Sequence, residues 1–236
     1  MIMILKIPES RNPGTRFPLE SAQDPDVGTN RLHSYNVNTN GYFTLNVKNL
    51  EDGRKVPELI LDKSLDRETS SFHKLVLTAI DVGNPARSGT TQLKVMVVDN
   101  NDNAPQFDKA LYKKYLNENT PPGNVAIKLK AIDLDDGVNG EVQYYLDDLT
   151  PDVVHKLFNL NSQTGEITVT GQLDYEETNL YAIDVIAKDK DNPEMEGHCK
   201  VQIHILDVNN NAPEIILTSL PSPVLENASI GTVITL

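Results

Sequence analysis

Residues 99–105 have the sequence Asp-Asn-Asn-Asp-Asn-Ala-Pro, and 108 positions later residues 207–213 have the related sequence Asp-Val-Asn-Asn-Asn-Ala-Pro. A repeat of roughly 100 residues has the size of an immunoglobulin-like β-sandwich. The spacing therefore predicts tandem copies of one domain. The two heptapeptides are called the first joint (99–105) and the second joint (207–213).

Other acidic motifs recur between the two copies at nearly the same offset. The matching segments are Glu9 with Glu118 and Glu226, 24–30 with 133–139, 65–68 with 173–176, and 79–81 with 187–189. Acids at fixed positions in every copy point to a shared role rather than to an ordinary solvated surface. We expect one repeat at 1–103, a second at 104–211, and the truncated start of a third at 212–236.

Period-2 alternation of apolar and polar residues predicts half-buried strands along both copies. The segments with this pattern are 75–79, 93–97, 127–131, 181–187 and 201–205. Residues 158–160 and 166–169, with a turn at Gln163-Thr-Gly165, predict a hairpin. No window predicts a helix. The expected fold class is all-β, with tandem seven-stranded, antiparallel, Greek-key (immunoglobulin-like) β-sandwiches.

Composition narrows the function. The chain of 236 residues has 34 acids against 21 bases and a net charge of -13, which argues against nucleic acid and anionic membrane surfaces as partners. Cations are the natural ligands. The single cysteine, Cys199, excludes an intrachain disulfide framework; we expect a small buried side chain, with an interchain disulfide as the alternative. No apolar run has the roughly 18 to 20 residues of a membrane span.

The residue types in the repeated motifs favour calcium. Calcium takes roughly 6 to 8 oxygen ligands, and the motifs contain Asp, Glu and Asn, whereas His and Cys, the usual zinc ligands, are absent from them. An EF-hand is excluded because Ala104 stands where the loop needs glycine and Ala110 where it needs glutamate. The ligands must therefore come from separated segments of two neighbouring domains.

These motifs resemble those of the cadherin ectodomain repeat: a Pro-Glu glutamate, Asp-x-Asp, Asp-Arg-Glu, Ala-x-Asp and Asp-x-Asn-Asp-Asn-Ala-Pro. Within that family the sequence is similar to those of clustered protocadherins. Pro13 to Glu20 resembles their second ectodomain repeat, and Gly197 to Cys199 with Leu217 to Leu220 resembles the passage from the third repeat to the fourth. The chain is thus expected to be a piece of a longer array.

The resemblance implies a complete three-calcium site at the first joint. It assigns Glu9, Asp66, Glu68 and Asp102 to a first ion; Glu9, Glu68, Asp99, Asp102, Asp135 and the Asn100 carbonyl to a second; and Asn101, Asp133, Asp135, Asp189 and the carbonyls of Asn103 and Asn139 to a third. Eight carboxylates would then face three divalent ions. Without metal, each carboxylate pair near 5 Å would repel by roughly 3 kcal/mol at an effective dielectric near 20.

The resemblance also implies two partial junctions. Asp24, Asp26, Asn30 and Asp81 would serve a joint with a preceding domain, and Glu118, Asp174, Glu176, Asp207 and Asn209 would serve the second joint. There Asn210 occupies the position that Asp102 fills at the first joint. Because an amide replaces a carboxylate shared by two ions, we expect weaker calcium binding at the second joint.

The resemblance favours calcium-dependent homophilic cell-cell adhesion, through antiparallel pairing with the same protein on an apposed cell. The parent protein would be a single-pass protein at the extracellular side of the plasma membrane. Two alternatives are a calcium-stiffened spacer and a carbohydrate-binding accessory module. The Asp/Glu pairs could also be the catalytic pair of a glycosidase. An enzyme is disfavoured because the predicted sandwich gives no sign of a substrate cleft.

Several residues outside the joints also have assigned expectations. Loop-length differences between the copies make 36–56 and 147–156 candidates for recognition, and Asn227 begins a glycosylation sequon. His198 and His204, on one strand face, are expected to pack rather than bind metal.

Overall fold

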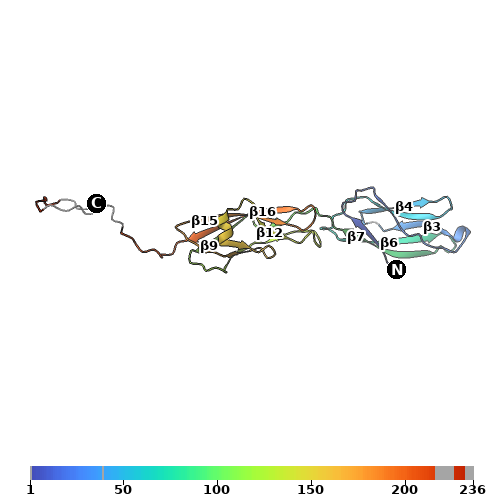
Figure 1. The fold of residues 1–236 in the computed structure, drawn as a ribbon. Helices are drawn as coiled ribbons and strands as arrows, with labels where there is room; N and C mark the ends of the chain where they lie inside the picture. The colour runs from blue at the N-terminus through green and yellow to red at the C-terminus, as the bar shows by residue number, and fades with distance from the viewer. Residues whose placement is uncertain (1, 39, 216–225, 232–236) are drawn as a thin grey trace.

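The computed structural model describes residues 2–38, 40–215 and 226–231 and shows two sandwiches end to end (Figure 1). In the first sandwich, one sheet has four strands and the facing sheet has three. The four-stranded order is β1 (Ile2–Pro8), β7 (Ser88–Val98), β6 (Phe72–Asp81) and β3 (Leu32–Val37). The three-stranded order is β2 (Arg16–Pro18), β5 (Lys55–Leu61) and β4 (Phe43–Asn49), and a single 3-10 turn, η1, spans Gly28–Asn30.

The second sandwich repeats this arrangement. Its four-stranded sheet has the order β12 (Gln143–Leu146), β15 (Leu180–Lys188), β16 (Glu196–Leu206) and β9 (Leu111–Asn117). Its three-stranded sheet has the order β10 (Val125–Lys128), β14 (Glu166–Val169) and β13 (Phe158–Leu160). A short ribbon pairs β8 (Gln106–Phe107) with β11 (Ala131–Ile132), and α1 spans Asp152–Leu157. The all-β tandem sandwich predicted from the sequence is confirmed.

Each sandwich has its own hydrophobic core, built from the inward residues of alternating strands. Phe43, Leu59, Leu75 and Val95 are among the buried residues of the first core. Phe158, Ile167, Ile183 and Val201 are among those of the second. Because side chains alternate between the faces of a strand, this burial follows directly from the period-2 pattern in the sequence. The predicted hairpin is also confirmed, since β13 pairs with β14 from Phe158–Val169 to Leu160–Ile167.

The prediction that all strands are antiparallel is wrong for one pair in each sandwich. β1 runs parallel to β7, with Pro8 opposite Val98, and β9 runs parallel to β16, with Asn117 opposite Leu206. In a parallel pair both strands end at the same edge of the sheet. The residues that follow these strands, Glu9 beside Asp99 and Glu118 beside Asp207, are therefore brought to the same end of their sandwich.

Two further local predictions are wrong. The alternation at 127–131 is not one strand, because the backbone N–H of buried Leu129 donates to Gly165 (2.8 Å) and the chain passes there from β10 to β11. The helix α1 was not predicted, since its six residues bury only Val154 and leave no apolar stripe to detect.

The remaining expectations concern single residues and the C-terminal segment. Cys199 is a free, buried thiol, and burial raises its pKa to about 12, so it stays protonated as expected of a packing residue. His204 stacks on Tyr115, with ring centroids 4.8 Å apart. Most of the predicted third repeat lies outside the described residues, and its described parts (212–215 and 226–231) contain neither helix nor strand.

Candidate metal centre

A buried glutamate organises each joint in the same way. The Glu9 carboxylate, 6% exposed, accepts hydrogen bonds from the backbone N–H groups of Arg67 (2.7 Å) and Asn100 (2.8 Å). Glu118, 3% exposed, accepts from Tyr175 (3.0 Å) and Val208 (2.8 Å). Glu9 thus ties the turn before β6 to the start of the first joint, and Glu118 ties the turn before β15 to the start of the second.

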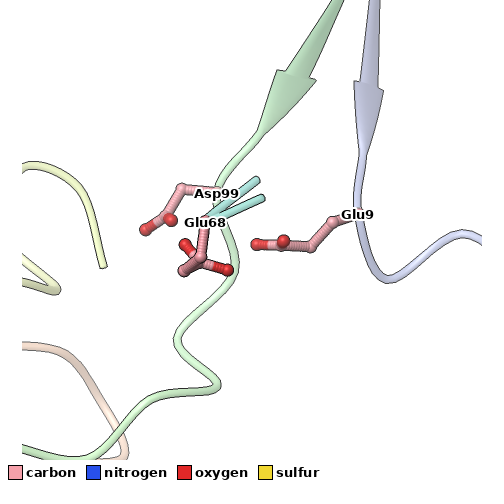
Figure 2. Close-up of side chains that lie close together, drawn as sticks. All are labelled: Glu9, Glu68 and Asp99. Carbon is pink, nitrogen blue, oxygen red and sulfur yellow. The ribbon is translucent and has the colours of Figure 1, made fainter. Parts of the chain in front are cut away.

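The first acidic cluster lies at the end of the first sandwich. Figure 2 shows the carboxylates of Glu9, Glu68 and Asp99 converging from three segments of the chain, and each offers an oxygen within 4.8 Å of the others. The side chains of Glu68 and Asp99 are only 18% and 13% exposed. Asp66 lies nearby in sequence, and both of its oxygens accept hydrogen bonds from Thr69.

The second cluster joins the two sandwiches. Glu68 of the first sandwich, Asp102 of the joint and Asp135 of the second sandwich each offer an oxygen within 4.8 Å of the others. Asp135 is 8% exposed, and Asn103 donates to it from both the backbone N–H (3.2 Å) and the side-chain amide (2.7 Å). Carboxylates separated by 67 residues in the sequence therefore share one space across the joint.

The residues predicted for a third ion lie on the side of the second sandwich. Asp189, 2% exposed, accepts hydrogen bonds from the backbone N–H groups of Asp191 and Met195, at 3.1 Å each. Asp133 accepts one from Asp135 (2.9 Å). Asn101 reaches from the joint toward this loop and donates its side-chain amide to the Pro193 carbonyl (3.2 Å).

Three oxygens of this region are buried and accept no hydrogen bond from the described residues: Asn101 Oδ1, Asp133 Oδ2, and Glu68 Oε1, which lies 2.5 Å from the Arg67 guanidinium. Each belongs to a residue predicted from the sequence as a calcium ligand. A buried polar atom without a partner is costly, at roughly 1 to 3 kcal/mol. An all-oxygen set with unpaired acceptors fits a hard cation such as calcium and does not fit zinc.

Burial and, to a smaller extent, mutual repulsion shift the pKa values of the acids at the joint. Burial, together with neighbouring carboxylates, raises the pKa of Glu68, Asp102 and Asp133 above the ordinary values. By contrast, hydrogen bonds from Thr69 lower the pKa of Asp66. The centre of the joint thus disfavours its own charged state in the absence of a cation.

The carbonyl ligands remain predictions. The structure instead shows other roles for the same residues: the Asn100 N–H donates to Glu9, and the Asn139 side-chain amide donates to Asp99 (2.9 Å). The Asn103 side-chain amide donates to Asp102 (2.8 Å).

The partial junctions are assembled to different degrees. At the far end of the first sandwich, Asp24, Asp26 and Asp81 line one shallow surface hollow, and Gly83 lies against Asn30 and Asp81. At the second joint, Glu118, Asp174 and Glu176 each offer an oxygen within 4.8 Å of the others. Asp207 and Asn209 follow β16 directly, and the Asn211 amide donates to Glu176 (2.9 Å) and to Asn210 (2.6 Å).

Sequence reasoning missed one residue of the first joint. No role was predicted for Arg67, but its guanidinium contacts Glu68, Asp99 and the Leu134 carbonyl. The available signal was the difference between the copies, because the second copy has Tyr175 where the first has Arg67.

Comparisons with known proteins agree with this architecture. A model of the cadherin domain matches residues 4–98 and 112–206. Protocadherin gamma-C5 of Homo sapiens is 49% identical over 230 residues, covering 98% of this chain and 24% of that protein. The chain therefore spans about a quarter of the length of the curated relatives it matches.

Two solved structures of protocadherin gamma B2 are also similar. The structure of its extracellular cadherin domains 1–5 is 44% identical with a TM-score of 0.88, and the match covers 99% of this chain and 44% of that one. The structure of its domains 3–6 is 28% identical with a TM-score of 0.77, over 92% of this chain and 51% of that one. The relatives are protocadherins rather than enzymes. Among the described residues, no helix is long and apolar enough to cross a membrane.

Proposed function

Because the chain belongs to the cadherin family and its relatives are clustered protocadherins, we propose that it mediates calcium-dependent, homophilic cell-cell adhesion and recognition as part of a cell-surface ectodomain. The partner would be the same protein on an apposed cell. The parent protein would be anchored in the plasma membrane with these domains on the extracellular side.

The acidic cluster across the first joint carries the calcium part of this proposal. Glu68, Asp102 and Asp135 come from the first sandwich, the joint and the second sandwich, and they converge within 4.8 Å. Bound calcium would supply positive charge that turns their repulsion into attraction between the two sandwiches. The residues proposed as ligands are Glu9, Asp66, Glu68, Asp99, Asn100, Asn101, Asp102, Asn103, Asp133, Asp135, Asn139 and Asp189. Extracellular modules bind calcium at roughly 0.1 to 1 mM, so the joint would be loaded outside the cell.

A rigid pair of sandwiches suits recognition by a long surface. Two sandwiches on a hinge would lose orientational freedom on binding, whereas a pre-aligned rod has less to lose. Homophilic pairing of identical chains is isologous, so one surface must complement itself. The two sandwiches differ most in the proposed recognition segments: 36–56 includes β4 and the start of β5, whereas 147–156 includes most of α1.

The comparison with protocadherin gamma B2 supports the assignment of the chain to the second and third repeats. Identity is 44% to its domains 1–5 but only 28% to its domains 3–6. The better match therefore uses at least one of the first two domains, which the second structure lacks. In clustered protocadherins, these repeats would lie in the middle of the antiparallel pair.

Analytical ultracentrifugation tests the proposal. An ectodomain that includes the flanking first and fourth repeats should form dimers with calcium and monomers with a chelator. The variant Glu68→Gln, which removes a proposed ligand at the joint, should weaken the dimer at intermediate calcium. Glu20→Gln, the same change at an exposed glutamate that follows β2 and lies outside the proposed recognition segments, is the control. An ectodomain that stays monomeric at high concentration with calcium would indicate a spacer without self-recognition.

A further inference from the structure

Arg67 places a positive charge inside the acidic joint. Its guanidinium lies against the Asp99 carboxylate through Nε and 2.5 Å from Glu68 Oε1, a contact with the distance of an ion pair but without hydrogen-bond geometry. The same group donates to the backbone carbonyl of Leu134 (2.5 Å), which belongs to the second sandwich. Arg67 thus contacts both sandwiches, and its side chain is only 15% exposed.

Asp99 extends this connection. One of its oxygens accepts from Arg67, and the other accepts from the Asp136 backbone N–H (3.0 Å) and the Asn139 side-chain amide (2.9 Å). Asp136 and Asn139 follow β11 in the second sandwich. A continuous set of hydrogen bonds between protein groups therefore links the sandwiches through Arg67 and Asp99.

The charge of Arg67 is stabilised where it lies. Burial alone disfavours a charged guanidinium, but the hydrogen bond to Asp99 and the nearby charges of Glu68 and Asp136 raise its pKa further above an already high value. A guanidinium carries five N–H donors in a fixed planar fork, which allows it to serve Asp99 and Leu134 at once. The tyrosine at the matching position of the second copy, Tyr175, has no positive charge and cannot do this.

Arg67 and calcium would compete for the same carboxylate oxygens, because each draws on the lone pairs of these oxygens. Glu68 and Asp99 are both proposed calcium ligands, and both contact Arg67. We propose that Arg67 is an internal cation of the first joint, which ties the two sandwiches together when calcium is scarce and is displaced from Glu68 and Asp99 when calcium binds. The displacement by calcium, the second half of this inference, rests on the proposed function. The link between the sandwiches, its first half, stands without it.

Nuclear magnetic resonance relaxation of the metal-free chain tests the first half. In a chelating buffer, the backbone ¹⁵N correlation times of both sandwiches should fall in Arg67→Tyr relative to the wild type, because the sandwiches then tumble more independently. Arg16→Gln is the matched control: it removes one arginine and its ion pair with Glu58 (3.5 Å), neither of which belongs to the proposed ligand set, and it should leave the correlation times unchanged. Unchanged correlation times in Arg67→Tyr would overturn the proposal that Arg67 ties the two sandwiches together.

Calorimetric titration with calcium tests the second half. Arg67→Tyr and Arg67→Gln should bind calcium about two- to fivefold more tightly, the range expected when a competing, partly exposed charge is removed. Arg67→Lys keeps the charge but lacks the fork, so it should loosen the metal-free joint without tightening calcium binding.

The two halves give distinguishable failures. If Arg67 only supported the fold, its replacement would weaken calcium binding by the chain. Weaker calcium binding in Arg67→Gln would therefore overturn the proposed competition between Arg67 and calcium. Thermal melting of each variant, unchanged for both sandwiches, shows that the readouts come from folded protein. If the wild type does not bind calcium at all, the proposed function fails while the metal-free link between the sandwiches still stands or falls on its own relaxation data.

Discussion

The first and second joints are built on the same scaffold and differ in their chemistry. In both, a parallel strand pair brings a buried glutamate, Glu9 or Glu118, beside the start of the joint, and two backbone N–H groups hold it there. This glutamate with its two backbone hydrogen bonds is called the backbone clamp. The residues around the backbone clamp differ between the two joints. The first joint has Asp102 and Arg67, whereas the second has Asn210 and Tyr175 at the matching positions.

The comparison separates what the fold requires from what the joint can tune. The backbone clamp depends on strand pairing and is preserved in both copies, so the position of the acids follows from the sandwich itself. The number of carboxylates and the presence of an internal cation depend on single side chains. Neighbouring joints of one array can therefore differ in calcium affinity and in their behaviour without calcium while sharing one geometry.

The largest effect is expected from a glycine at the contact between the first joint and the second sandwich. A Cβ on Gly197 would lie 1.8 Å from the Pro105 carbonyl oxygen, whereas a Cβ on Gly89, the matching glycine of the first sandwich, would meet nothing within 4 Å. Gly197→Ala should destabilise the second sandwich by about 1 to 3 kcal/mol through overpacking. Chemical denaturation should show almost no change for Gly89→Ala, and equal losses in both variants would contradict the contact.

Converting the first joint toward the second should weaken calcium binding. Asp102→Asn copies Asn210 and removes a carboxylate proposed to be shared by two ions. Affinity should fall about tenfold, which corresponds to about 1.4 kcal/mol. Calorimetry would measure it, with Asp148→Asn as the control of equal charge. An Asp102→Asn joint that binds as tightly as the wild type would remove Asp102 from the ligand set.

The reverse change should strengthen the second joint. Asn210→Asp, in an ectodomain that includes the complete fourth repeat, restores a carboxylate beside Glu118, Asp174 and Glu176. Calcium binding there should tighten, by no more than the tenfold change expected at the first joint, because one carboxylate is exchanged in each case. A calcium titration followed by nuclear magnetic resonance, in which the residues of each joint give separate signals, measures the change. Weaker calcium binding at the second joint would contradict the prediction.

The smallest effect concerns pH and the matched pair His73 and Tyr181. Each packs edge-on against a core phenylalanine, His73 against Phe43 and Tyr181 against Phe158. Burial lowers the pKa of His73 below its ordinary value. The unfolded chain then binds more protons, so the first sandwich should lose stability as the pH falls below the unfolded value of about 6.5.

Melting curves at pH 7.5 and pH 5 measure this difference. The second sandwich should lose less stability over the same range, and His73→Tyr should remove the extra loss from the first. Equal acid sensitivity of the two sandwiches in the wild type would contradict the assignment to His73.

The sequence predicted the parts of the fold that depend on local pattern. Tandem sandwiches, the β13–β14 hairpin and the buried strands followed from period-2 alternation. The parallel edge pairs β1·β7 and β9·β16 did not, because alternation reports which face is buried and says nothing of strand direction. The helix α1 was missed since it buries a single residue, Val154.

The acids of the candidate site could be identified from their repetition, and the structure brings Glu9, Glu68, Asp99, Asp102 and Asp135 into two clusters. Their connection to Arg67 could not be deduced, because the reach of a long side chain across a joint depends on how two domains are placed. The roles of Asn103 and Asn139 as amide donors likewise depend on orientation, which the residue type leaves open.

Calcium binding at the first joint tests the central claim most directly. Calorimetric titration of the metal-free chain should show three calcium ions at the first joint with affinities near 0.1 to 1 mM. Glu68→Gln, which alters a member of both acidic clusters, should lose at least two of these ions, while Asp148→Asn should lose none. A wild-type chain that binds no calcium, or a Glu68→Gln variant with unchanged stoichiometry and affinity, would contradict the account.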